Sequence, residues 1–367
     1  MPIVIFVRAF VAVVICAVSL MPAGASAAGP VPRLLRDASR AAGFPVRGTV
    51  RTSKVSSVRY DRLFSRAWDR EYPSALRETD ASVYRAFGLV SRSVKAQPAR
   101  AWYDVGARRL FVQRRPAAGR RTIVHEYVRA LIDQNFKLRR LVGLRTRDRD
   151  RWLAANAIVD GTAALTSHLR PAPLRGTPLD RFSALEYGAG LGPGRSLAAQ
   201  LRYLGGRKAL TTALRTFPQT TEQLLHVDKF LERERALPVT LPATAGGAPL
   251  VASETFGELD VRSLLRAFNV PGAVATADGW GGGRLALYGK VAVIMLRWDT
   301  PDDAVQWQAA VPPYVAAAFP GETGHTCPPL DRCWSGPTEL AAGVYGATAV
   351  LASGPNAAAV AAALLHL

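Results

Sequence analysis

The chain has 367 residues, of which 49% are hydrophobic, and its formal net charge is +19 at pH 7. This length is ample for one large domain or two lobes with a sizeable core. No internal repeat or low-complexity tract occurs, which excludes a repeat architecture and leaves the positive charge as the main compositional signal.

The first 27 residues have the pattern of a secretory signal peptide. Arg8 precedes an apolar run from Ala9 to Leu20, and the segment ends in the small-residue cleavage pattern of Ala25–Ala27. The apolar run is too short to span a membrane. Cys16 lies inside it without a lipoprotein cleavage box, so no lipid anchor is expected. We therefore expect an exported protein, either extracellular or associated with the cell envelope, with no membrane span after signal cleavage.

The rest of the chain predicts an α+β protein that is predominantly helical. Residues 28–240 are expected to form a helical domain that contains one β-hairpin, and residues 241–367 a small α+β lobe packed on it. Residues 30–98 predict helices with irregular connections, including a helix around residues 82–90. A stripe of apolar residues at helical spacing marks an earlier helix in this stretch: Tyr60, Leu63, Phe64 and Trp68.

The periodicity changes at Ala101–Gln113, where two apolar β-forming stretches flank a short turn and predict a β-hairpin. Helices are expected next over residues 122–136 and 148–169. Gly161 inside the second helix costs about 1 kcal/mol relative to alanine, so we expect it to permit close packing.

Proline and glycine divide the following part of the chain. Residues 171–194 predict a long loop, and residues 237–250 predict a linker between the two lobes. Helices are expected near residues 195–204 and 207–216. The C-terminal lobe has a ββαββα pattern, with a helix at 261–268 before it, strands at 283–288 and 291–298, a capped helix starting at 299–302, strands near 339–345 and 348–352, and a last helix.

Only Cys327 and Cys333 remain after signal cleavage. A nearby pair with prolines between its members, in an oxidising compartment, favours a local disulfide. The alternative is a metal site, but no second Cys/His pair accompanies these two residues.

The helix at residues 122–136 contains the sequence HEYVR, in which His125 and Glu126 match the first two residues of a zinc-peptidase HExxH motif. In that motif two histidines four residues apart bind Zn²⁺, and the glutamate is the general base. Arg129 stands in place of the second histidine. A guanidinium cannot ligate zinc because it stays protonated and offers only donors.

Several segments extend this similarity. TIVHEYVRALIDQNFKL resembles the HExxHALQDQxFxL helix of a family of exported zincin-like metallopeptidase homologues of bacteria and archaea. The segments AWYDVGARRLFV, AANAIVDGTAAL, PQTTEQLLHVDKFL and GWGGGRLALYG with RWDTPDDA resemble further segments of that family, in the same order, from about residue 60 to residue 310. The resemblance implies a zincin-like helical lobe and, in members with intact ligands, zinc-dependent peptide hydrolysis.

Carried over residue by residue, the resemblance implies a degenerate zinc site. His125 matches the first ligand, Glu126 a vestigial general base, and Asp160 the third ligand, which is a glutamate in the family. An aspartate oxygen would fall short by about 1.5 Å, whereas zinc–oxygen bonds need about 2.0–2.2 Å. His168 and His226 are more simply ordinary polar residues than substitute ligands. We expect no bound metal, and zinc only if an unusual ligand set exists.

The guanidinium of Arg129 can supply the positive charge that a zinc ion would bring to the site. It lies on the same helix face as His125, so an ion pair with Asp160 or with Glu126 is expected, and Asp133 is a competing partner. The simpler alternative is that Arg129 is a surface residue of a decayed site.

Three functions follow. The first is a monomeric, catalytically inactive metallopeptidase-like protein that binds an unidentified protein or peptide in the former peptidase cleft, or has a structural role there. The second is an active zinc hydrolase with a non-standard ligand set, for which His226 or His325 would have to lie within coordination reach of His125. The third is an envelope protein that binds acidic polymers through its arginines. The arginine-rich runs at residues 114–121 and 139–151 lack interleaved aromatic residues, which favours an ordinary solvated surface.

Overall fold

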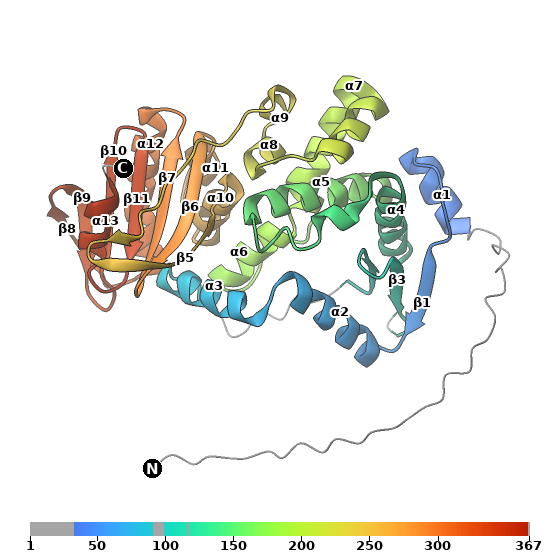
Figure 1. Cartoon of the computed structure of the whole chain (residues 1–367), viewed down its shortest axis with the longest axis horizontal. Coiled ribbons are helices and arrows are strands. Elements are labelled where there is room, and N and C mark those ends of the chain that lie inside the picture. Colours follow the sequence, from blue (N-terminus) through green and yellow to red (C-terminus); the bar gives the residue numbers. More distant parts are fainter. Residues whose placement is uncertain (1–32, 91–98, 116, 366–367) are drawn as a thin grey trace, which may run out of the picture. The chain divides into compact units, whose positions relative to one another are not determined.

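The computed structural model in Figure 1 describes residues 33–90, 99–115 and 117–365. About 52% of the chain is helical and 20% is in strands, which confirms the predicted α+β class with more helix than strand. The expected signal peptide at residues 1–27 lies outside the described residues. Within the described ranges, no helix is both long and apolar enough to cross a membrane.

A three-stranded sheet supports the first part of the fold, in the order β1-β3-β2. β2 (Ala101–Asp104) and β3 (Arg109–Gln113) form the predicted antiparallel hairpin. β1 (Arg51–Val55) adds parallel to β3, so the expectation of only helix and irregular connections over residues 30–98 is wrong here. Val55 is the one buried residue of β1, so this short strand has no apolar alternation that sequence could reveal.

The helix expected around residues 82–90 begins and ends earlier than predicted. α3 spans Ser74–Ala86, and the buried Phe87 follows as its C-cap. Gly88 then adopts a left-handed backbone with φ of 72°, which ends the helix. Val90 is consequently exposed and does not continue the apolar stripe.

The two helices that contain the sequence-predicted site residues are α4 (Arg120–Phe136) and α5 (Arg149–Ser167). α5 is capped by Asp148, whose side chain accepts a hydrogen bond from the Arg151 amide. A Cβ atom at Gly161 would lie 2.1 Å from the backbone of Gly194, so this glycine does permit close packing, as predicted.

The long loop expected at residues 171–194 is wrong, because α6 (Pro178–Tyr187) and a short π-helix lie within it. Thr177 and Asp180 form a capping box at the start of α6, with Pro178 in the first turn. α7 (Arg195–Thr216) has non-helical backbone angles at its two central glycines, which confirms the predicted division into two helical segments.

The remaining elements of the helical region connect these parts. They are α1 (Arg33–Ala42), α2 (Ser57–Glu71), the 3₁₀ turn η1 (Leu138–Leu141), the π-helix η2 (Gly190–Gly194), α8 (Thr221–Leu225) and α9 (Val227–Glu232).

The C-terminal region is built on an eight-stranded antiparallel sheet in the order β4-β5-β6-β7-β11-β10-β9-β8. The elements of the predicted ββαββα pattern are present, but two further strands that were not predicted, Thr323–Cys327 and Leu330–Ser335, follow its first helix. The bounds are β4 (Thr244–Ala245), β5 (Ala248–Thr255), α10 (Glu258–Ala267), α11 (Ala273–Ala277), β6 (Trp280–Tyr288), β7 (Val291–Trp298), α12 (Pro301–Ala318), β8 (Thr323–Cys327), β9 (Leu330–Ser335), β10 (Leu340–Tyr345), β11 (Thr348–Ser353) and α13 (Ala357–Leu365).

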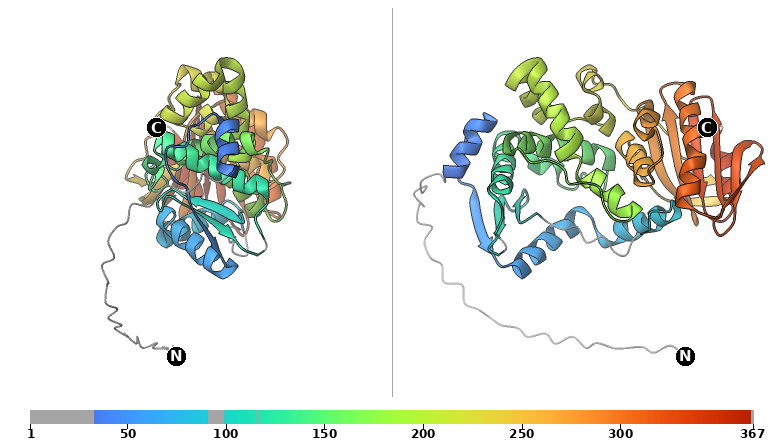
Figure 2. Two further views of the ribbon diagram at one scale, coloured as in Figure 1. Left: turned by 90° about the vertical axis from the view of Figure 1, so that its right-hand side faces the viewer. Right: turned by 180° about the vertical axis from the view of Figure 1, so that it is seen from behind.

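The central strands are apolar on both faces because helices cover both faces. Ile294 and Leu296 of β7 pack in the core beneath α12, whereas Val293 and Met295 pack in a second core beneath α13. Successive side chains of a strand point to opposite faces, so a strand between two covered faces is apolar throughout. The sheet therefore lies between the two helices (Figures 1 and 2).

The linker expected at residues 237–250 is wrong, because this segment is attached to the sheet. β4 and the start of β5 lie within it, and the Leu237 amide donates to the Gly281 carbonyl. Prolines and glycines in this stretch shape turns at the sheet edge and do not separate two parts of the chain.

Candidate functional site

α4 and α5 bring the sequence-predicted site residues together. His125, Glu126, Arg129 and Asp133 come from α4, and Asp160 comes from α5. All but Asp160 are at least largely buried, and Asp160 is 30% exposed in its side chain. The crossing of the two helices thus places several charged groups in a small volume, where each needs a partner.

Arg129 lies between two carboxylates. Its Nε is 2.8 Å from Asp160 Oδ1, and its Nη1 is 3.6 Å from Glu126 Oε2. The Asp160 contact is short but not aligned as a hydrogen bond. Burial by itself lowers the pKa of Arg129, but Asp160 and Glu126 outweigh burial and hold this pKa above its ordinary value. The guanidinium is therefore charged, and it occupies the side of α4 where a second histidine would be needed.

Glu126 is held in place and is not free to act as a base. Its Oε2 accepts a 2.8 Å hydrogen bond from the Tyr103 amide of β2. Burial raises the pKa of the carboxyl, against the opposing charge of Arg129 and the hydrogen bond from Tyr103. A general base must reach the proton that it removes, and here one carboxylate oxygen already links α4 to the hairpin.

His125 is behind the charged pair. It is 7% exposed, and its Nε2 lies 3.9 Å from Glu126 Oε1 and 4.0 Å from Asp160 Oδ1. Its Nδ1 is buried without a hydrogen-bond partner in the described part of the chain. Contacts of this length are too long for hydrogen bonds, so the imidazole is surrounded by carboxylates without being fixed by them.

Asp133 has a structural role in place of the expected competition for Arg129. Its Oδ2 accepts a 2.8 Å hydrogen bond from the Tyr103 hydroxyl, and its Oδ1 accepts one of 2.9 Å from the Leu138 amide. Arg108 lies 3.6 Å away as an ion-pair partner. Asp133 therefore attaches the end of α4 to the β2–β3 hairpin.

The charged group forms the floor of a cleft with a volume of about 1020 Å³. β2, at the edge of its sheet, forms one wall and α2 contributes to another. His125 is not among the described residues that line the cleft, whereas Glu126, Arg129 and Asp160 are. The aromatic lining residues are Phe64, Trp68, Trp102, Tyr103, Trp152 and Tyr187.

The aromatic side chains form a connected series along the cleft. Trp68 contacts both Tyr187 and Phe64, at ring-centroid distances of 5.3 Å and 6.4 Å, and Phe64 contacts Trp102 at 5.4 Å. Such rings provide a large apolar area at small cost in conformational entropy. A cleft with apolar walls, on which a few polar groups converge, is typical of a binding site.

These residues do not fit a zinc ion. A catalytic zinc site needs three protein ligands and one open position. Arg129 stands at the position where the resemblance predicts a second histidine, and it lies 2.8 Å from Asp160, the predicted third ligand. Among the described residues, the groups of three or more metal-ligating side chains with donor atoms within 4.8 Å of one another do not include His125.

The other histidines within the described residues lie elsewhere in the fold. His168 is the left-handed C-cap of α5, and His325 is an exposed residue of β8. His226 lies between α8 and α9, with its Nε2 3.0 Å from Glu258 Oε1. Within the described residues, the ion-pair contacts of His125 involve only Glu126 and Asp160.

A buried ionic cluster that the sequence did not reveal lies where α5, α6 and α10 meet. Arg149 donates to Asp260 Oδ1 and to Glu186 Oε1, both at 2.5 Å, and the three side chains are at most 3% exposed. Next to it, Asp150 accepts hydrogen bonds from the Thr221 amide and hydroxyl, and burial raises the pKa of Asp150 to about 8. Its residues are up to 111 positions apart in sequence, so no local pattern marks them.

A second cluster centres on Lys229 of α9. Its Nζ lies 2.5 Å from Glu222, 3.1 Å from Glu234 and 2.7 Å from Asp299. Glu222 and Lys229 belong to the quoted segment PQTTEQLLHVDKFL, and Asp299 to RWDTPDDA. The charged residues in these two segments were the sequence signal for this cluster, because the resemblance covers both segments.

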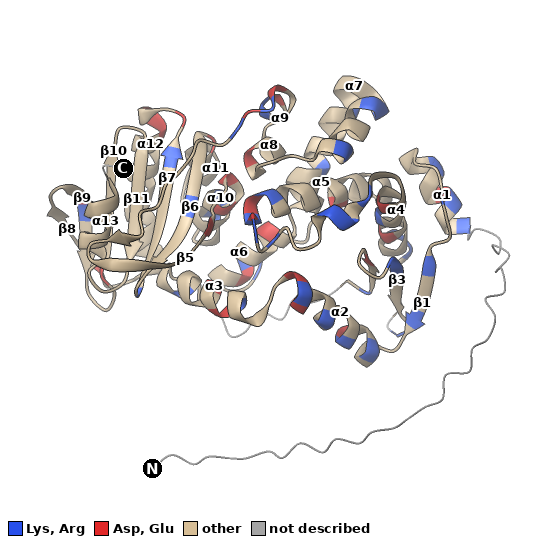
Figure 3. Ribbon diagram, in the orientation of Figure 1, with Lys and Arg blue, Asp and Glu red and all other residues tan. Residues whose placement is uncertain are grey.

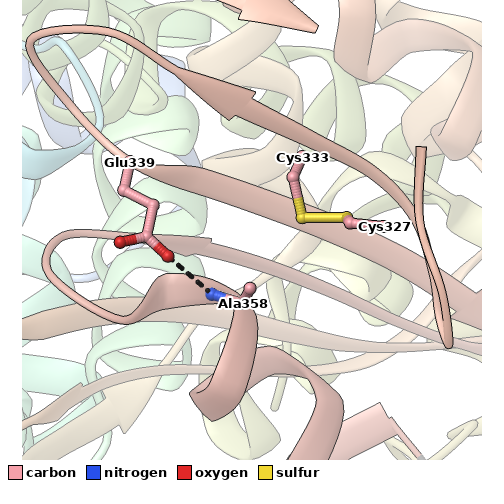
Figure 4. Close-up of a disulfide and its surroundings, with 4 residues drawn as sticks. All are labelled: Cys327, Cys333, Glu339 and Ala358. Atoms are coloured by element: carbon pink, nitrogen blue, oxygen red, sulfur yellow. Dashed lines mark hydrogen bonds between the residues drawn. A yellow bond between two sulfur atoms is a disulfide. The ribbon is translucent and has the colours of Figure 1, made fainter. Parts of the chain in front are cut away.

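The predicted disulfide between Cys327 and Cys333 is confirmed, with a Cα–Cα distance of 5.8 Å (Figure 4). It joins β8 to β9 at the edge of the large sheet. Near it, Glu339 accepts hydrogen bonds from the Asn356 and Ala358 amides and so caps α13. The disulfide is compatible with export.

The positive charge is confined to one part of the sequence. Residues 1–240 contain 41 lysines and arginines against 18 acidic residues, whereas residues 241–367 contain 6 against 10. Figure 3 shows basic residues along β1 and α2 and at several other helices of the first part. Residues 1–240 therefore carry a net charge of +23 (41 minus 18) and residues 241–367 carry −4 (6 minus 10), which together give the +19 of the chain.

Comparison with known proteins adds one match. Residues 248–364 match the family model of a domain of unknown function, DUF8575. This match covers β5 to β11 with α10 to α13, and it begins after the last cleft residue, Tyr187. No curated protein and no solved structure matches the chain.

Proposed function

We propose that the protein is an exported, zincin-like metallopeptidase homologue that has lost its metal and binds a peptide segment in the former peptidase cleft. The observation that supports this most directly is the position of Arg129. Its guanidinium lies between Glu126 and Asp160 at the floor of an aromatic cleft. A charged arginine there supplies the positive charge that a zinc ion would bring, without the ability to activate water.

The cleft suits an extended peptide for two reasons. β2 is an edge strand, and extended peptides can add to such an edge by main-chain hydrogen bonds. The aromatic series from Tyr187 to Trp102 offers apolar contacts for side chains of that peptide. Because Glu126 already holds the Tyr103 amide, an added peptide would pair with other backbone groups of β2.

The zincin-like origin can be tested by restoring the ligands. The double variant Arg129→His and Asp160→Glu would give the helix pair two histidines and a glutamate. We expect it to bind one more zinc ion per chain than the parent protein, measured by elemental mass spectrometry after dialysis. A variant that is folded but gains no zinc would contradict the proposed relation to metallopeptidases.

The binding role can be tested by tryptophan fluorescence, because three of the seven tryptophans line the cleft. A tryptic digest of casein, separated into fractions, serves as the probe. We expect some fractions to change the emission of the wild type and to lose this effect with Trp68→Ala. Cleavage of the peptides by the wild-type protein would contradict the inactive assignment and favour a hydrolase with a non-standard ligand set.

The charge distribution favours a second candidate, binding of acidic polymers by the helical region. Its test is retention on heparin, which should fall steeply with salt and should not change with Trp68→Ala. Retention that is weak at low salt would exclude this candidate.

A further inference from the structure

A third group of ligating side chains lies away from the cleft. His226 precedes α9, Glu258 is the first residue of α10, and Asp278 is the C-cap of α11. One donor atom from each lies within 4.8 Å of the other two. His226 Nε2 is 3.0 Å from Glu258 Oε1 and 4.0 Å from Asp278 Oδ1.

This group differs from the cleft cluster, the Arg149 cluster and the Lys229 cluster in having no arginine or lysine between its carboxylates. Arg129 occupies the cleft cluster, and Lys229 Nζ contacts all three carboxylates of its own cluster. The nearest guanidinium to the third group, that of Arg262, lies 3.7 Å from Asp278, beyond hydrogen-bond distance. Among the described residues, Arg262 forms an ion pair with Asp278 but none with Glu258.

Glu258 provides the second observation. Its side chain is completely buried, and its Oε2 has no hydrogen-bond partner within the described residues. A buried carboxylate oxygen without a partner is costly, and buried charges are normally paired or coordinate metals. His226 and Asp278 are 25% and 47% exposed, so an ion can reach the group from solvent.

The spacing and donor types suit zinc. Two ligands bound at 2.0–2.2 Å in a tetrahedral site are about 3.4 Å apart. The two observed distances from His226 Nε2 lie on either side of this value, so adjustments of less than about 1 Å would bring the donors into place. Imidazole nitrogen and carboxylate oxygen are both donor types that zinc binds, and three such ligands leave the fourth position for water.

We propose that His226, Glu258 and Asp278 form a binding site for a divalent transition metal of the zinc class. The site joins the α8–α9 segment of the helical region to α10 and α11, which belong to the region matched by the DUF8575 model. A bound ion replaces the His226–Glu258 hydrogen bond and fixes this junction. The inference does not depend on the proposed function of the cleft.

The experiment measures zinc in the mature protein after treatment with a chelator, dialysis and addition of zinc chloride. We expect one zinc ion per chain in the wild type. His226→Ala and Asp278→Asn should each weaken zinc binding by at least about 100-fold, more than the loss of an outer-shell partner usually costs. The exposed His325→Gln is the matched control and should retain full binding.

Asp278→Asn keeps the test valid if His226→Ala fails to fold, because Asp278 is a half-exposed helix cap. Substitution by Co²⁺ should give an absorption spectrum that is absent from the Asp278→Asn variant. A wild type that binds no zinc would overturn the inference and leave the cleft proposal intact. Zinc that persists in both variants but disappears with His125→Asn would overturn this inference and the proposed loss of the cleft metal together.

Discussion

Two arginines on successive helices, Arg129 in α4 and Arg149 in α5, neutralise pairs of carboxylates in different ways. Arg149 is 3% exposed and makes two 2.5 Å hydrogen bonds to acids that are equally buried. Arg129 is 16% exposed, its shortest contact is not aligned, and its partner Asp160 reaches solvent. Arginine thus holds two buried carboxylates by aligned hydrogen bonds in one site, whereas in the other it balances the charge of Asp160 without an aligned hydrogen bond.

The difference indicates which site retains capacity to bind. A guanidinium whose donors are directed at buried acids is committed to the fold. A guanidinium at the floor of an open cleft still has donors that a ligand can use. Measurements on the two arginines can separate these roles.

The largest effect is expected from Arg149→Met. Removal of the guanidinium leaves Glu186 and Asp260 buried without their cation, which typically costs about 3–5 kcal/mol of the free energy of unfolding. Urea denaturation measures this loss, with the exposed Arg147→Met as control. A loss below about 1 kcal/mol would mean that the cluster is not a structural element.

The next effect concerns pH and Asp150, beside Arg149. Burial raises the pKa of Asp150 to about 8 in the folded state, whereas an unfolded aspartate has a pKa of about 3.9. Between these values the folded state holds a proton that the unfolded state has lost. The contribution of the protonated Asp150 to the free energy of unfolding is therefore complete below the unfolded pKa, and it is lost as the pH rises to about 8.

Each pH unit in this window should lower the free energy of unfolding by up to about 1.4 kcal/mol through this group. Asp150→Asn should make the dependence shallower, because an amide does not titrate. Urea denaturation at several pH values between 5 and 8 compares the two slopes. Equal slopes would show that Asp150 is ionised in the folded protein.

The smallest effect on stability is expected from Arg129→Met, at about 1 kcal/mol, because Asp160 can be hydrated when its partner is lost. The same variant should change peptide binding in the fluorescence assay, whereas Arg149 variants that remain folded should not. A loss of stability as large as that of Arg149→Met would remove the distinction between the two sites.

The parts of the fold that sequence predicts are those with local signals. The hairpin at β2–β3, the capped start of α12 at Thr300, and the interruption of α7 at Gly205 and Gly206 each have their cause within a few residues. β1 and β5 lack such a signal, because partner strands far away in sequence make them strands. Sequence therefore missed the sheet edges and mistook residues 237–250 for a linker.

The residues of the candidate sites also divide into those with a local sequence signal and those without one. The spacing of His125, Glu126 and Arg129 on one helix is local, so a common site with Asp160 could be expected from the motif and the family resemblance. The Arg149 cluster and the His226 group combine residues of α5, α6 and α10 with the N-cap of α9 and the C-cap of α11. Only the folded chain brings those residues within contact distance, and burial, which raises the pKa of Asp150, is equally invisible in sequence.

Gly257 has a consequence for how the two regions are inherited. A Cβ atom at this position would lie 1.7 Å from Asp150 Oδ1 and 2.4 Å from Thr221 Oγ1, so no side chain fits. Gly257 belongs to the segment matched by the DUF8575 model, whereas Asp150 and Thr221 precede it. A relative that carries the sheet domain without the helical region has no such obstruction and is free to vary here. We therefore expect glycine at this position in relatives that keep both regions.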